Sequence, residues 1–342
     1  MTTIIIKSFN RPYYLDRCLQ SIYKNVSGSF NIKVLDDGTP LEYLNRLQSI
    51  YTDVIFETSA QYDKKIQSID ENLNQGKPIN GFEIPTDLWY NAVKNSSNYV
   101  LVIEDDVWFV DKINLDVITS EMQSNKVVLT KLGWLGIYKD DQYNQITKLT
   151  DSLQQVIPQK IFTSNKFVMD LFMYNKYKFF TILYKLKKVD NYSMRKYWTL
   201  NSILMGLYQK EYWLTIWCDA KGKVDEKQQL RNAAAWYHSN KNAIFARTNQ
   251  EYLKTTFKSS ATGSYHEYGN NFDVNRMNHI LNKAWLNQEF DAMENYPHDF
   301  SDAYIKLFLD QSNHPNSQYA EWFDWAEKFR NQYRALDAEV DN

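Results

Sequence analysis

Short apolar runs alternate with segments of helical periodicity through the first hundred residues, and this alternation limits the fold more than any other sequence feature. Residues 3–8 form a β-branched run of strand length that stops at a polar break, Asn10-Arg11-Pro12. A continuous apolar strand of this kind belongs in a parallel sheet that is covered on both faces. Pro12 suits the first turn of a helix, and apolar residues follow at helical spacing from residue 15 to residue 22.

The same order of elements continues along the chain. We expect strands over 31–35, 53–58, 99–103 and 212–218, and helices over 41–51, 85–94, 197–208, 278–293, 301–310 and 318–338. Strands that alternate with helices predict an α/β fold, with a mostly parallel sheet flanked by helices. The run of helices after residue 250 predicts a C-terminal helical extension.

Composition excludes several classes of protein. The 342 residues are 44% hydrophobic and 23% charged with a net charge of −2, so nothing global attracts nucleic acid. Two cysteines fit a reducing compartment, and no run is long enough to span a bilayer. The first six residues do not resemble a signal peptide, so we expect a soluble cytoplasmic protein. Lysines and tyrosines crowd residues 174–188, which predicts either peripheral contact with anionic lipid at the inner face of the membrane or a solvated helix face.

Three carboxylates, Glu104-Asp105-Asp106, follow directly after the predicted strand 99–103. Adjacent like charges raise one another's pKa, and a divalent cation is the usual remedy. Ligands bind beyond the carboxyl ends of the strands in an open α/β sheet, and oxygen ligands favour Mg²⁺ or Mn²⁺. The alternative is a solvated turn, but the apolar residues 107–109 indicate that the acids lie between buried segments.

A second acidic turn, Asp36-Asp37-Gly38, ends the predicted strand 31–35 and therefore opens onto the same edge of the sheet. A carboxylate there can accept a hydrogen bond from a base imide or a ribose hydroxyl. Gly38 allows the backbone to turn closely beneath such a ligand. An ordinary β-turn is the competing interpretation.

Four motifs in this order resemble nucleotide-sugar glycosyltransferases of the GT-A fold, nearest to their large family 2. The motifs are residues 4–12, 15–22, 34–39 and 102–107, and the similarity covers about residues 3–110. It implies that Phe9 and Arg11 flank the base of a nucleotide-sugar donor and that Asp36 or Asp37 contacts it. It also implies that Asp106 binds Mn²⁺ or Mg²⁺ directly, with Asp105 in support. The resemblance further implies that Glu104, Asn74 and Asn91 line the donor site.

The second half resembles the family less closely. Such enzymes often carry an acidic pair on an acceptor-side helix, but the corresponding residues 197–204 contain no acid. Asp190 is the candidate base, Asp219 is the next choice, and a plain loop residue is the alternative for Asp190. The family often completes the metal site with a histidine, and the candidates here are His238 and His266. The alternative for His238 is a hydrogen-bonded histidine of the core.

Tryptophan placement and domain limits complete these expectations. Trp134, Trp198 and Trp236 are expected near an acceptor cleft, whereas the C-terminal Trp285, Trp322 and Trp325 predict a packing surface or a homodimer interface. Residues 1–250 are expected to form the catalytic domain, with a donor half to about 110 and an acceptor half from 111, and 251–342 the extension.

The resemblance implies a metal-dependent transfer of a hexosyl or N-acetylhexosaminyl group from a UDP-sugar to a glycan or lipid-linked acceptor. The expected stereochemical outcome is inversion, and the expected setting is polysaccharide or surface-glycan synthesis. Two alternatives stay open: a nucleotidyltransferase, and a catalytically silent sugar- or nucleotide-binding subunit on the same fold.

Overall fold

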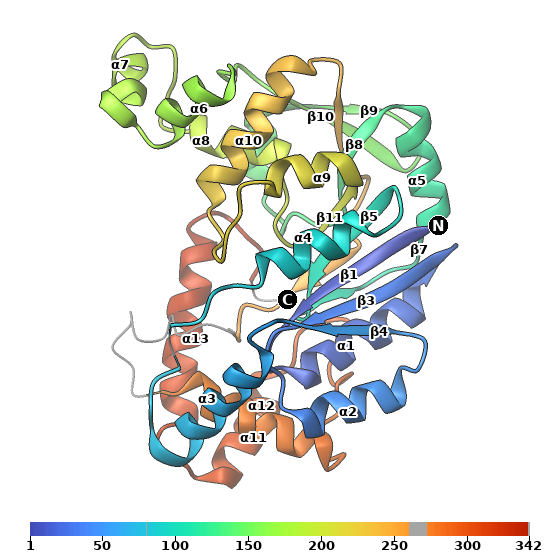
Figure 1. Cartoon of the computed structure of the whole chain (residues 1–342), viewed down its shortest axis with the longest axis vertical. Coiled ribbons are helices and arrows are strands. Elements are labelled where there is room, and N and C mark those ends of the chain that lie inside the picture. Colours follow the sequence, from blue (N-terminus) through green and yellow to red (C-terminus); the bar gives the residue numbers. More distant parts are fainter. Residues whose placement is uncertain (80, 260–271, 341–342) are drawn as a thin grey trace.

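A nine-stranded sheet forms the centre of the computed structural model, which describes residues 1–79, 81–259 and 272–340 (Figure 1). In spatial order its strands are β4 (Ile55–Thr58), β3 (Phe30–Asp36), β1 (Thr2–Ser8), β5 (Tyr99–Glu104), β11 (Gly206–Gln209), β8 (Val127–Lys131), β12 (Ile244–Thr248), β10 (Leu153–Pro158) and β9 (Asn144–Lys148). Two small sheets pair β13 (Leu253–Thr255) with β6 (Val107–Phe109) and β2 (Val26–Ser27) with β7 (Ile113–Asn114). The predicted α/β class is confirmed.

The sheet is mixed, and its N-terminal part is the parallel part. Strands β4, β3, β1 and β5 are parallel neighbours, and β8 is parallel to β12. The strand β11 runs antiparallel to both β5 and β8, so β8 and β5 run in the same direction. The carboxyl ends of β1, β3, β5, β8 and β12 therefore lie along one edge of the sheet.

Helices cover both faces of this sheet because successive side chains of a strand point to opposite sides. Ile4 and Ile6 of β1 belong to one buried cluster and Ile5 to the other. The first cluster includes side chains of α1 (Pro12–Asn25), α2 (Leu41–Ile50), α5 (Leu115–Ser124), α11 (Val274–Leu286), α12 (Asp302–Ser312) and α13 (Tyr319–Arg334). The second includes side chains of α4 (Thr86–Lys94), α6 (Lys166–Met173), α9 (Lys210–Trp217) and α10 (Glu226–Ser239). The remaining helices are α3 (Tyr62–Gln75), α7 (Phe179–Lys185), α8 (Ser193–Lys196), η1 (Tyr138–Tyr143), η2 (Lys176–Lys178) and η3 (Tyr197–Leu200).

Two predicted elements between residues 197 and 218 are wrong. The predicted helix 197–208 is the short η3 followed by strand β11, and the predicted strand 212–218 is helix α9. Residues 212, 213, 216 and 217 are buried at helical spacing against the second cluster, whereas a short apolar run cannot by itself distinguish helix from strand. Tertiary packing decided both elements.

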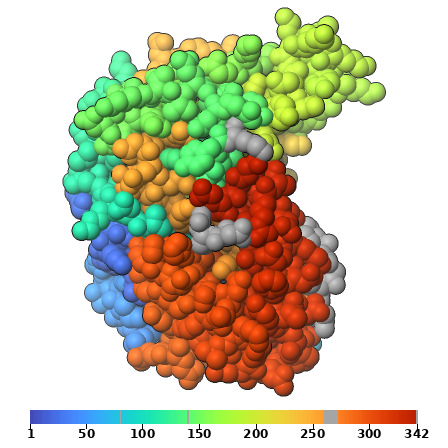
Figure 2. Space-filling view, turned by 180° about the vertical axis from the view of Figure 1, so that it is seen from behind, coloured from blue at the N-terminus to red at the C-terminus, as the bar shows by residue number. Residues whose placement is uncertain are grey.

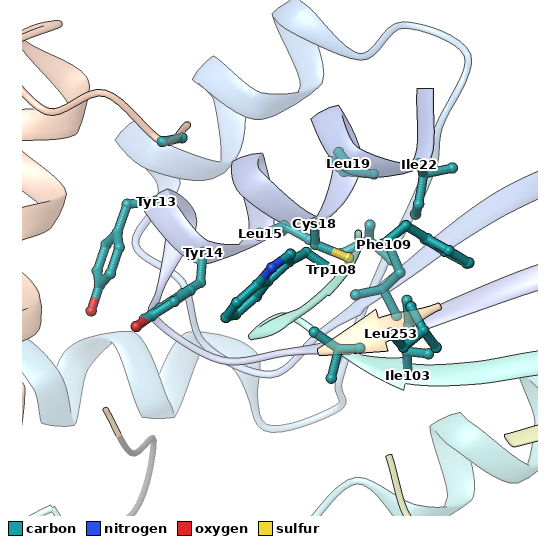
Figure 3. Packing of buried hydrophobic residues seen from close by; sticks show 14 of the residues in the cluster. Tyr13, Tyr14, Leu15, Cys18, Leu19, Ile22, Ile103, Trp108, Phe109 and Leu253 are labelled. Atoms are coloured by element: carbon teal, nitrogen blue, oxygen red, sulfur yellow. The ribbon is translucent and has the colours of Figure 1, made fainter. Parts of the chain in front are cut away.

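The C-terminal helices pack against α1 rather than standing apart. Figure 3 shows Tyr13 and Tyr14 of α1 in the buried cluster that also holds Trp108. The indole of Trp285 donates to Asp16 Oδ2 at 2.7 Å. Trp322 and Trp325 are fully buried in the chain's own core, so the packing interpretation of these tryptophans holds and they offer no exposed surface to a second copy. The domain limit near residue 250 stays a prediction.

Among residues 1–79, 81–259 and 272–340, no helix is both long enough and apolar enough to cross a bilayer.

Candidate functional site

A cavity of about 780 Å³ opens at the carboxyl edge of β1, β3 and β5. Its walls come from the end of β1 and the following loop, from residues 72–79 and 81–89, from the end of β5 and from the start of α11. Five residues that the sequence predicted for a donor site line it, namely Phe9, Arg11, Asp37, Glu104 and Asp105, and their role in donor binding stays a prediction. The cavity is large enough for a ligand of nucleotide-sugar size.

The three consecutive acids divide between two cations. Lys7 Nζ donates to Glu104 Oε1 at 2.6 Å, across the neighbouring ends of β1 and β5. Arg11 donates to Asp105 and, through Nη1 at 2.9 Å, to Asp106 Oδ2. Arg11 therefore pairs with both buried aspartates from within the chain, so that one positive charge faces two carboxyl groups.

Burial and charge act against each other in this cluster. Burial raises the pKa of Asp105 and of Asp106, and the Arg11 guanidinium opposes the rise. Burial alone would lower the pKa of Arg11, but the two aspartates raise it above its ordinary range. The guanidinium is therefore charged at every physiological pH, and it stands where the sequence predicted a divalent cation.

The residues present do not fit a divalent metal ion in this arrangement. Asp106, the predicted ligand, and Asp105, its predicted support, both hold Arg11. Asp106 also does not line the cavity, although its Oδ1 is buried without a hydrogen-bond partner. His238 is exposed at the end of α10, and it too lies outside the cavity lining. Across residues 1–79, 81–259 and 272–340, no group of three His, Cys, Asp or Glu side chains is placed to hold a metal. His266 lies outside the described residues.

The Asp36-Asp37-Gly38 turn uses its two acids differently. Asp36 is fully buried and accepts from the backbone N–H of Gly38 and Thr39 at 3.0 and 2.7 Å, so it holds the turn and does not line the cavity. Asp37 lines the cavity and pairs with Lys65. A Cβ on Gly38 would lie 2.9 Å from the Phe9 ring, and its φ is +146°, so glycine is required there. Burial raises the pKa of both carboxyls, and hydrogen bonds from Thr39 and from Lys65 oppose it.

Aromatic rings and cations share one side of the cavity. Lys65 Nζ lies 6.0 Å from the ring centroid of Phe9 and 5.8 Å from that of Phe82. Lys7 Nζ lies 4.8 Å from the ring of Trp89. Rings can stack on a planar base or a sugar, and the three cations Lys7, Lys65 and Arg11 can bind phosphate.

Asparagines from α11 complete the wall. Asn10 has a φ of +51° and donates to Asn275 Oδ1 at 2.9 Å, while Asn282 Nδ2 donates to the Asn10 carbonyl at 3.2 Å. Asn275 and Asn278 line the cavity. The C-terminal region thus fixes the residue that precedes Arg11.

The other predicted site residues lie outside this cavity lining. Asn74 and Asn91 are exposed on α3 and α4, and Asn74 bonds to Asp70. Asp190 accepts from Tyr192 N–H, Ser193 and Lys196 within its own turn. The roles predicted for Asn74, Asn91 and Asp190 stay predictions.

Asp219, the second candidate base, follows α9 rather than a strand. It pairs with Lys166 at 2.6 Å and with Arg231. Burial by itself would raise the pKa of Asp219, but these cations lower it overall. A carboxylate with a lowered pKa and two cationic partners is a poor proton acceptor in this state, and the role of Asp219 as a base also stays a prediction.

A second, smaller cavity of about 50 Å³ lies near the ends of β8 and β12, at the same edge of the sheet. Trp134 and Trp198 line it together with Arg195 and Arg247. Trp236 does not; its ring packs 4.5 Å from that of Tyr212. Two of the three tryptophans predicted near an acceptor cleft therefore share one hollow.

Sequence reasoning missed Lys7, Lys65, Trp89 and the α11 asparagines as parts of the large cavity. The available signal for Lys7 is its register position, because the last residues of adjacent parallel strands face one another. No local signal marks Asn275, which is 265 positions from its partner Asn10.

The fold is similar to that of solved glycosyltransferase structures. No protein-family model and no curated protein matches the sequence. A structure of S. aureus TarS, residues 1–349, is 12% identical, with 97% of this chain and 73% of that chain covered at a TM-score of 0.41; the same fragment is also solved with UDP-GlcNAc. The bifunctional glycosyltransferase WbbM is 10% identical over 68% of this chain and 37% of its own, at a TM-score of 0.35. A mannosyltransferase from Pyrobaculum calidifontis, solved with GDP-Man and Mn²⁺, is 12% identical over 38% of this chain and 34% of its own, at a TM-score of 0.27.

Proposed function

We propose that this chain is a glycosyltransferase that takes a sugar from a nucleoside-diphosphate sugar, with a UDP-sugar favoured. The observation that carries the proposal is the large cavity at the carboxyl edge of the parallel strands, which three cations and four aromatic rings line. Cations suit a diphosphate, and rings suit a base and a sugar. Asp37 beside Lys65 offers a carboxylate for the imide or ribose of the nucleotide.

The residues of this chain supply charge and orientation for the reaction. We propose that Lys7 and Arg11, which line the cavity and pair with Glu104 and with the two aspartates, also bind the diphosphate. There they would stabilise the negative charge that grows on it as the bond to the sugar breaks. Phe9 lines the cavity and its ring packs against Gly38, so we propose that this ring stacks on the base. A need for Mn²⁺ or Mg²⁺ is a separate prediction, which the removal of metal in the assay below tests.

The acceptor is proposed to enter along the same edge of the sheet. Trp134 and Trp198 line the smaller cavity, and rings of this kind stack on sugars, which supports a glycan or lipid-linked acceptor whose hydroxyl attacks the donor with inversion. The transferred group would be a hexosyl or N-acetylhexosaminyl unit. Synthesis of a polysaccharide or surface glycan on the cytoplasmic side is the setting that we propose.

One observation favours the catalytically silent binding subunit as a second candidate. Both predicted bases, Asp190 and Asp219, are engaged by cations of their own surroundings and lie outside the large cavity. Such a protein would bind nucleotide-sugar and release no nucleotide.

A paired binding and turnover experiment separates these functions. Thermal shift with UDP-, GDP- and dTDP-sugars measures binding, because a ligand of the native state raises its melting temperature. Release of UDP, measured with Mn²⁺ and with EDTA, reports turnover. We expect Asp37→Ala to weaken UDP binding about tenfold or more, as expected when a charge-assisted hydrogen bond is lost, and Asp63→Ala, an exposed carboxylate on α3, to leave it unchanged. If no nucleotide shifts the melting temperature of the wild type, the proposed function is wrong; binding without release supports the silent subunit.

A further inference from the structure

A projecting segment of the second half combines positive charge with exposed apolar side chains. We define the lysine arm as residues 166–188, which comprise α6, η2, α7 and the residues that follow α7. Figure 2 shows this yellow-green segment standing out from the rest of the surface, and Figure 1 places α7 at the far end from the C-terminal helices. No residue of the lysine arm lines the large cavity.

The arm is strongly basic although the chain as a whole is slightly acidic. It holds six lysines and one aspartate, a net charge of +5 against −2 for the whole chain. Lys166 and Lys176 pair with acids. Within the described residues, the side chains of the other four have no ion pair or hydrogen bond; they are Lys178, Lys185, Lys187 and Lys188. Their charge is therefore available to a partner.

The same segment exposes an unusual amount of apolar surface. Five of the sixteen exposed large apolar side chains of the described residues lie in these 23 residues. Tyr177 is 88% exposed, Phe167 72% and Leu186 62%, and Ile182 and Tyr184 are exposed as well. Scattered single residues of this kind are ordinary, but five of them within one lysine-rich segment of 23 residues indicate an interaction surface.

The arm is mounted on the core, so its exposure does not come from a loose end. Met169 and Phe172 of α6 are buried, and Arg231 of α10 donates to Asp170 at 2.9 Å. In α7, the ring of Phe180 packs 5.2 Å from that of Phe172. One side of α7 thus packs inward, and the opposite side presents Ile182, Lys185 and Leu186, which are spaced three and four residues apart.

We propose that the lysine arm binds the surface of a bilayer that contains anionic lipid. Apolar side chains that alternate with lysines suit the boundary between headgroups and acyl chains, where the rings and aliphatic groups insert and the ammonium groups reach the phosphates. Charge complementarity supports the same partner, since polybasic segments bind negatively charged leaflets. A nucleic acid or an acidic protein would use the charge but would leave Ile182 and Leu186 without a role.

The test is vesicle flotation of the full chain with phosphatidylcholine alone and with 30% phosphatidylglycerol added. We expect binding only with phosphatidylglycerol, and weaker binding in 0.5 M NaCl because salt screens the lysines. Each lysine near such a surface contributes about fivefold to binding. Replacing Lys178, Lys185, Lys187 and Lys188 with glutamine should therefore weaken binding about 600-fold, to the level seen with phosphatidylcholine.

Matched variants make the result specific. The control replaces four other exposed lysines with glutamine, namely Lys64, Lys94, Lys112 and Lys221, for the same change in net charge. The apolar variant carries Tyr177→Ser, Ile182→Ser and Leu186→Ser and should also lose most vesicle binding. Because the readout is lipid binding, it does not depend on the proposed sugar transfer, and a melting temperature equal to that of the wild type shows that a variant is folded.

Several results would overturn the proposal. The first is that the wild type does not bind phosphatidylglycerol vesicles at 0.1 M NaCl. The second is that the control variant loses as much vesicle binding as the lysine-arm variant. The third is that the lysine-arm variants bind vesicles as tightly as the wild type. Binding to a single-stranded oligonucleotide that is as tight as vesicle binding would assign the arm to nucleic acid instead.

Discussion

Replacing Arg11 with methionine removes the cation that holds two buried carboxylates. The side chains of Arg11 and Asp105 are 5% and 1% exposed, and that of Asp106 is 12% exposed. Removing one member of a buried ion pair typically costs about 3–5 kcal/mol, because the remaining charge stays buried without a partner. We expect the free energy of unfolding to fall by about this amount at pH 7.5. Affinity for UDP should fall by about tenfold or more, since a charge-assisted hydrogen bond to phosphate is lost.

Urea unfolding and calorimetric titration with UDP measure the two effects. Arg46→Met is the matched control, because Arg46 is exposed on α2. The double variant Arg11→Met with Asp105→Asn removes one of the stranded charges, so it should recover part of the lost stability, and the two changes should not be additive. Stability of Arg11→Met within about 1 kcal/mol of the wild type, or simple additivity in the double variant, would refute the assignment of Arg11 as the internal counter-charge.

Three further predictions follow from other contacts. Arg17 is fully buried and donates to the carbonyls of Ala292, Glu294 and His298. Arg17→Met should therefore lower the free energy of unfolding by about 3–5 kcal/mol, because three buried acceptors lose their donor. A urea midpoint near that of the wild type would contradict this prediction. Asn282 holds Asn10 from outside the cavity, so Asn282→Ala should weaken UDP binding by about threefold to tenfold in titration calorimetry. The control Asn287→Ala changes an exposed residue and should leave the affinity unchanged. Equal affinities of Asn282→Ala and the wild type would show that α11 does not position the loop after β1. The folded-state pKa of Asp219 is lowered, so this carboxylate stabilises the protein above its unfolded pKa near 4 and loses that effect as the pH falls through the folded value. Asp219→Asn should therefore be less stable by about 0.5–1 kcal/mol at pH 7, with a gap that closes toward pH 3 in pH-dependent denaturation; a constant gap would contradict the ion pairing.

The elements that local pattern could predict are those whose packing is uniform along their length. Strands β1 and β5 carry apolar side chains on both faces, whereas β3 alternates apolar and polar side chains from Phe30 to Val34. All three end at acids or turns, so their period and limits are visible in the sequence. Residues 197–218 carry aromatic runs that suit either helix or strand. Only their contacts with α10 and with β5 and β8 selected η3, β11 and α9.

The sequence by itself determined the α/β class, the edge of the sheet at which the acids gather, and five lining residues of the large cavity: Phe9, Arg11, Asp37, Glu104 and Asp105. These follow from local order, because a strand that ends in a polar residue must place that residue at the sheet edge. Only the tertiary structure decided that Arg11 pairs with Asp105 and Asp106. It also decided that Asp36 holds a turn and that Asn275 and Asn282 bond to Asn10. Those pairings join residues up to 272 positions apart, and their energy depends on burial that no local pattern encodes.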